Sequence, residues 1–146
     1  MGPRLAPPVL SWLCSIRAEI GGMHEFTSAH GVNRALFPIT GGELDGEGLA
    51  GRILPGGADF ARGLPDGSYA IEARYFVRLV DGTLLGITNA GRMRLQPDGS
   101  YLGRTRAEID APAGRFGWLN DRVIFGTALA EAGDDTRVFI ELWLAD

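Results

Sequence analysis

Apolar and polar residues alternate along much of this 146-residue chain, and a period of two predicts β-strands. Every second residue from Cys14 to Ile20 is apolar, and residues 69–80 and 83–92 repeat the pattern with aromatic and branched side chains. Turn signals rich in Gly, Pro and Asp recur roughly every ten to fifteen residues, which leaves little room for helices. Shorter strands are predicted at residues 35–39, 49–54, 101–109, 123–129 and 137–144.

These strands predict an all-β fold. The most economical arrangement is a single antiparallel, meander-like sheet of about 8–10 strands, closed into a β-barrel because closure removes the exposed edges. Residues 1–13 form a Pro-rich leader that is expected to be disordered, and residues 14–146 form the barrel domain.

The dipeptide Asp81-Gly82 separates the two longest predicted strands and is typical of a two-residue type I′ hairpin turn. In that register Val80 faces Thr83, and each step away from the turn conserves the sum of the paired residue numbers. One face of the hairpin then carries Glu72, Arg74, Phe76, Ile87 and Asn89.

Three interpretations of this polar face stay open. If it lines the barrel lumen, Arg74 could orient a carboxylate or enolate and Asn89 could donate to an oxyanion. Alternatively, Glu72 and Arg74 only solubilise an outer wall, or the three polar residues form a buried network that fixes the strands. Tyr75 lies on the other side of its strand, so it competes with Arg74 for the lumen.

Composition and charge exclude several classes of function. Acidic residues outnumber basic ones by 18 to 14, which disfavours a nucleic-acid partner. All basic residues are Arg, which excludes Schiff-base and P-loop lysines. The single cysteine, Cys14, cannot form an internal disulfide and is interpreted as a packed thiol. The apolar run at residues 7–16 is too short to span a membrane, so we expect a cytoplasmic protein without a membrane partner.

Asp59 is the strongest candidate for chemistry. It follows Pro55-Gly56-Gly57-Ala58, where glycines let a ligand approach the backbone, and a desolvated carboxylate there could act as a general base. The competing interpretation is an Asp that caps its own turn. Trp118 and Asn120 could add an aromatic wall and an amide, although Trp at a strand entry more often packs in a core.

His24, Glu25 and His30 lie within seven residues of one another, but the spacing is poor for a metal site and no further histidine exists. No metal is therefore expected. The sequence also lacks G-x-G-x-x-G, G-x-S-x-G and C-x-x-C, so no cofactor is predicted.

Several motifs together resemble the uncharacterised DUF3237 (UPF0311) family of small bacterial and fungal proteins. The similarity covers about residues 16–144. The resemblance implies a compact antiparallel β-barrel that often assembles into oligomers, and it implies no settled activity. The motifs are the stretches at residues 41–46, 49–60, 66–67, 72–75, 81–82, 89–91, 116–120 and 123–126.

We therefore predict a cofactor-independent enzyme that performs isomerase, cyclase or lyase-type proton transfer on a small, largely apolar carbonyl-bearing or aromatic molecule. Asp59 would be the base, with Arg74, Asn89 and Glu72 as its polar partners. The substrate walls would be Phe76, Ile87, Trp118, Asn120 and Tyr75. The alternatives are a non-catalytic carrier barrel and a solid, purely structural oligomer.

Overall fold

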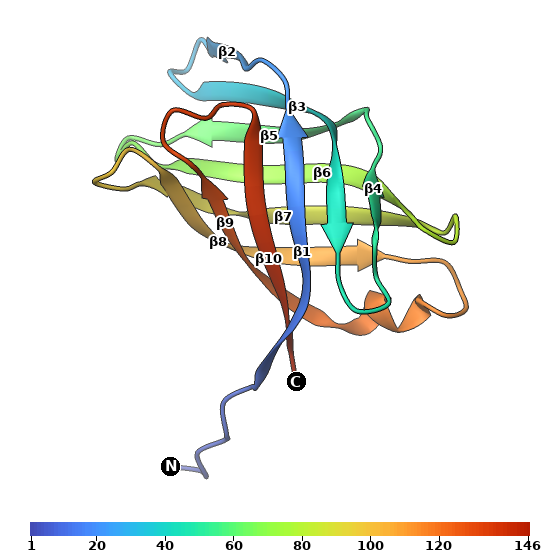
Figure 1. Ribbon diagram of the computed structural model, residues 1–146. Coiled ribbons are helices and arrows are strands. Elements are labelled where there is room, and N and C mark those ends of the chain that lie inside the picture. The colour runs from blue at the N-terminus through green and yellow to red at the C-terminus, as the bar shows by residue number, and fades with distance from the viewer.

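Ten strands and one short 3₁₀-helix make up the computed structural model, which describes residues 1–146 (Figure 1). The strands are β1 (Leu10–Ile20), β2 (His24–Thr27), β3 (Asn33–Asp45), β4 (Gly51–Ile53), β5 (Gly57–Gly63), β6 (Tyr69–Leu79), β7 (Leu84–Leu95), β8 (Tyr101–Asp110), β9 (Val123–Ala130) and β10 (Arg137–Ala145). The helix, η1 (Gly117–Asp121), connects β8 to β9.

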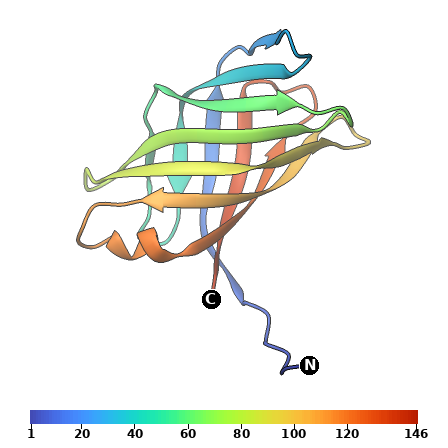
Figure 2. The ribbon, with the colours of Figure 1, turned by 180° about the vertical axis from the view of Figure 1, so that it is seen from behind.

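The sheet closes on itself, which confirms the predicted barrel. Adjacent strands of the sheet follow the order β1-β10-β9-β8-β7-β6. The short strands β4 and β5 each pair with β6 on one side and with β3 on the other. Pairing of β3 with β1 then completes an eight-stranded antiparallel barrel. Strands β5–β8 form a broad wall, green to orange in Figure 2. The β2–β3 hairpin projects from one end, and η1 lies at the other (Figure 1).

The core fills the barrel at the η1 end. Because strand residues alternate between faces, every second side chain of β6 to β10 points inward and packs against its neighbours. Leu119 of η1 is almost completely buried, and Cys14 is buried as expected for a packed thiol. Burial, with a smaller contribution from Glu141 and Asp45, raises the pKa of Cys14 to about 12. This end of the barrel is therefore plugged.

The hairpin register differs by one residue from the prediction. The loop has three residues, because the Leu79 N–H donates to the Thr83 carbonyl at 2.8 Å. Gly82 alone in this loop adopts a positive φ, of 90°, whereas a type I′ turn needs two such residues. Asn89 consequently pairs with Ala73 rather than with Arg74. A shift of one residue moves a side chain to the opposite face of the sheet.

One strand boundary and two whole strands also differ from the prediction in ways that bear on the site. Strand β1 begins at Leu10, inside the predicted leader, because Leu10 pairs with Ala145. Strand β2 lies in a segment predicted as a loop. Strand β5 lies where the sequence predicted a bend, and it places Asp59 within a strand, which removes the turn-cap interpretation. No helix of the structure has the length and hydrophobicity needed to cross a membrane.

Candidate active site

A cavity of about 500 Å³ opens at the end of the barrel opposite η1. It lies where β1 and β9 end and β10 begins, so loops form its rim and strands form its wall. Its volume is in the range typical of small-molecule sites. The wall is mainly apolar and includes Ile20, Phe37, Ala61, Ile71, Met93 and Val138.

Asp59 is the one acidic residue on the strand wall of this cavity. It projects inward from β5, whose backbone pairs with that of β6. A side chain at Gly57 would collide with the backbone carbonyl of Arg74 and with Cβ of Tyr75, so only Gly permits this approach. The turn before β5 relies on Gly56, whose φ is 109°. The Pro-Gly-Gly sequence thus explains how the carboxyl comes to lie in the barrel.

The environment of Asp59 favours its protonated form. One carboxyl oxygen, Oδ1, is buried and has no hydrogen-bond partner. Burial raises the pKa of Asp59 from 3.8 to about 6, and the backbone N–H of Glu72 offsets only part of this effect. A carboxyl with this pKa can both accept and return a proton near neutral pH.

Two tyrosines line the same cavity as Asp59. Tyr69 lies at the start of β6, and Tyr101 lies at the start of β8. Their ring centroids are 5.8 Å apart and the planes meet at 70°, an edge-to-face contact. Burial raises the pKa of the Tyr69 phenol, and Tyr101 and Glu25 raise it further. The Tyr69 phenol therefore remains a protonated donor at neutral pH.

Polar side chains also lie inside the barrel beyond the cavity. Asn89 is 3% exposed, and its amide oxygen has no partner. The pairings Asp59–Ala73 and Ala73–Asn89 put Asn89 in the same row of the wall as Asp59, two strands away. The hydroxyls of Tyr75 and Thr105 are likewise buried without partners, and burial raises the pKa of Tyr75 strongly. Asn89 and Tyr75 thus share the interior with Asp59, although neither lines the cavity.

Glu72, Arg74 and Phe76 lie on the outer surface, which corrects the lumenal interpretation. The side chain of Arg74 is 59% exposed, and its Nε lies 3.9 Å from Glu72. Its guanidinium lies over the outward-facing ring of Phe60, 5.1 Å from the centroid. Tyr75, Val77 and Leu79 face the core, so alternation along β6 turns Glu72, Arg74 and Phe76 outward. The one-residue register shift places Asn89 on the inner face, opposite Ala73. The outer-wall interpretation is the one that the structure supports.

The remaining predicted residues lie outside the cavity. Trp118 and Asn120 belong to η1, at the plugged end, and Ile87 is buried in the core. Trp118 is exposed, with the Arg122 guanidinium 5.5 Å from its ring centroid. Asn120 bonds to the backbone of Ala111 through both its oxygen, at 2.9 Å, and its nitrogen, at 3.0 Å. It therefore fixes η1 to the end of β8.

The sequence did contain a signal for the residues that it missed. Alternation already places Tyr69, Ile71 and Ala73 on one face of β6. The predicted register set Arg92 and Arg94 beside them and so hid the apolar wall, whereas the observed register places Met93 there. No group of three potential ligands among His, Cys, Asp and Glu gathers where it could hold a metal ion.

Comparisons with known proteins agree with this architecture. The family model described as "Protein of unknown function (DUF3237)" matches residues 8–144. A UPF0311 protein from Rhodopseudomonas palustris is 30% identical, over 90% of this chain and 92% of the relative. A hydroalkoxylation enzyme from Penicillium herquei is 28% identical, over 87% of this chain and 78% of the enzyme. The crystal structure of a beta-barrel like protein from Acinetobacter baumannii superposes with a TM-score of 0.88 at 23% identity, covering 98% of this chain and 99% of that one.

Proposed function

The chain belongs to the DUF3237 family, and on this premise we propose that its barrel is an enzyme that adds the O–H bond of an alcohol or phenol across a carbon–carbon double bond. Asp59 is the proposed general base, and the cavity around it is the proposed substrate site. The observation that carries the proposal is a carboxyl with a pKa of about 6 in an apolar cavity. The similarity to a hydroalkoxylation enzyme suggests the type of reaction.

The proposed reaction balances without any added reactant. Ionised Asp59 takes the proton of a phenol or alcohol, and the oxygen then forms a bond to one carbon of the double bond. When a carbonyl is conjugated to that double bond, the π electrons move toward the carbonyl oxygen and give an enolate. The second carbon takes the proton back from Asp59, so the product is an isomer of the substrate when both groups belong to one molecule.

The apolar wall supports this chemistry in two ways. It excludes water, which strengthens the electrostatic effect of each polar group on the reacting atoms. It also holds a flat, apolar substrate so that the hydroxyl and the double bond stay close, which replaces an encounter in solution. The phenol hydroxyls of Tyr69 and Tyr101 are candidates to donate to the developing oxyanion.

The test uses 2′-hydroxychalcone, whose phenol adds to a double bond conjugated to a carbonyl and gives flavanone. We expect the protein to accelerate loss of the chalcone absorbance and to produce one flavanone enantiomer in excess. The rate should rise with pH through a pKa of about 6, because the base must be ionised.

Asp59→Asn should lower the rate at least about 100-fold while changing the Kd of the probe by less than about threefold. Asp110→Asn is the matched control, since Asp110 is an exposed residue at the end of β8. If the unmodified protein binds the chalcone but gives no excess of one flavanone enantiomer, the enzyme proposal is refuted in favour of a carrier. An Asp59→Asn variant that retains the full rate would refute the assignment of the base.

A further inference from the structure

The cavity contains carboxylates but no cation. Besides Asp59, its acidic residues come from the loop between β9 and β10, and no Arg lines the cavity. The chain has no Lys to supply another positive charge. The acidic residues of that loop are Glu131, Asp134 and Asp135.

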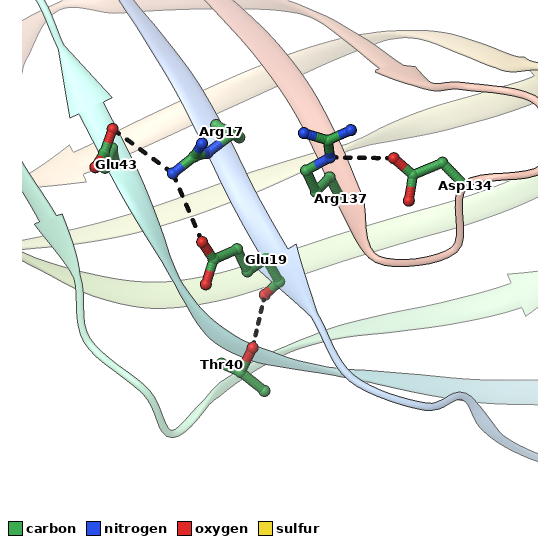
Figure 3. Close-up of polar contacts among 6 residues, drawn as sticks. All are labelled: Arg17, Glu19, Thr40, Glu43, Asp134 and Arg137. Carbon is green, nitrogen blue, oxygen red and sulfur yellow. Dashed lines mark hydrogen bonds and ion pairs between the residues drawn. The ribbon is translucent and has the colours of Figure 1, made fainter.

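The cation next to this loop is already neutralised. Arg137, at the start of β10, donates from Nε to Asp134 at 3.1 Å (Figure 3). Its guanidinium also lies over the ring of Phe139, 5.5 Å from the centroid. Asp134 in turn accepts from the backbone N–H and the hydroxyl of Thr136, at 2.9 and 2.5 Å. Arg137 is therefore occupied, and Glu131 and Asp135 form no ion pair.

The arginines of β1 and of the β5–β8 wall point away from the lumen. Arg17 on β1 forms ion pairs with both Glu19 and Glu43, and its Nη2 lies 3.6 Å from a carboxylate oxygen of each (Figure 3). On the β5–β8 wall the arginines occupy the face opposite to the cavity residues, because inward and outward positions alternate. These exposed residues are Arg62, Arg74, Arg78, Arg92, Arg94, Arg104 and Arg106.

We propose that the cavity accepts phenols and alcohols without a negative charge, and that Glu131 and Asp135 are specificity-determining residues that reject carboxylates and phosphates at its mouth. An anionic ligand would lose its hydration in an apolar cavity and would meet no cation there. It would also be repelled by the carboxylates of the rim. The substrate class rests on the proposed function, whereas the selectivity in binding does not.

The experiment compares binding of 2′-hydroxychalcone with binding of its 4-carboxylate at pH 7.5 and low salt, by quenching of tryptophan fluorescence. We expect the neutral probe to bind at least about tenfold more tightly, the order expected for one charge near several carboxylates. The double variant Glu131→Gln/Asp135→Asn should reduce this preference to about threefold or less. Glu47→Gln/Asp121→Asn removes the same charge from exposed positions at the plugged end and should leave the preference unchanged.

Equal or tighter binding of the carboxylate overturns the proposal. It is also overturned if the rim variant and the control variant show the same preference, or if neither probe binds. Selective binding of the neutral probe without turnover would support the selectivity and refute the enzyme proposal. Turnover of the neutral probe with equal binding of both probes would support the enzyme proposal and refute the selectivity, so the two failures are distinguishable.

Discussion

Replacing Asp59 by Asn is expected to stabilise the folded protein at neutral pH, even though the residue is the proposed base. Burial raises the pKa of Asp59 from 3.8 to about 6, a difference of about two units. One unit corresponds to about 1.4 kcal/mol, so ionising Asp59 costs the folded state about 3 kcal/mol at pH 7 and above. An amide has nearly the same shape and carries no charge, so the variant avoids this cost.

The pH dependence follows from the direction of the shift. Because the pKa is raised in the folded state, the folded protein binds this proton more tightly than the unfolded chain does. The free-energy cost of ionising Asp59 in the folded protein is therefore absent below the pKa that Asp59 has in the unfolded chain. It increases as the pH rises and reaches its full value above the pKa of Asp59 in the folded protein. The difference in unfolding free energy between Asp59→Asn and the unmodified protein should be less than about 1 kcal/mol at pH 4 and about 3 kcal/mol at pH 8.

Urea unfolding at several pH values, followed by tryptophan fluorescence, measures this difference. Asp110→Asn, at an exposed position on β8, is the reference for a carboxylate outside the cavity. The reasoning is refuted if Asp59→Asn is less stable than the unmodified protein at pH 8. It is also refuted if the effect of the substitution does not change with pH.

Three further substitutions test the surroundings of the cavity. Tyr75→Phe removes a buried hydroxyl that has no partner, so thermal unfolding should show equal or higher stability, by up to about 1 kcal/mol. Asn120→Ala breaks the bonds between η1 and β8 and should cost about 1–2 kcal/mol in urea unfolding while leaving probe binding unchanged. Arg74→Ala removes an exposed ion pair, so stability should change by less than about 1 kcal/mol and chalcone turnover should stay the same; a large loss of turnover would contradict its outward placement.

The strands of this barrel could be predicted from the sequence because most of them bury one face. The long hairpin shows where that approach fails. Asp81-Gly82 is compatible with both a two-residue and a three-residue loop, and the choice depends on whether Asp81 adopts a positive φ. The sequence does not determine the φ angle of Asp81. That angle nevertheless decides whether Asn89 shares a face with Arg74 or with Tyr75.

Asp59 was predicted as a site residue from the glycines that precede it. These were expected to let a ligand approach the backbone, whereas Gly57 makes room for the backbone of β6, and the glycines concealed the strand that carries Asp59. A carboxyl on an inward position breaks the alternation by which a strand is recognised, and such violations are typical of functional sites. Tyr69 and Tyr101 could not be ranked from the sequence, because their proximity depends on the pairing of β6, β7 and β8.

The closure of the barrel by β1 has a consequence for how the chain folds. Ile16 pairs on one side with Leu44 and on the other with Ile140, residues that are far apart along the chain. Contacts between such distant segments form slowly, because a long loop must lose its conformational freedom first. We expect refolding on a time scale of milliseconds to seconds, with β1 and β9 presenting open edges until β10 inserts between them. During that interval the β9 edge is where self-association would begin, so conditions that delay insertion of β10 should favour aggregation over folding.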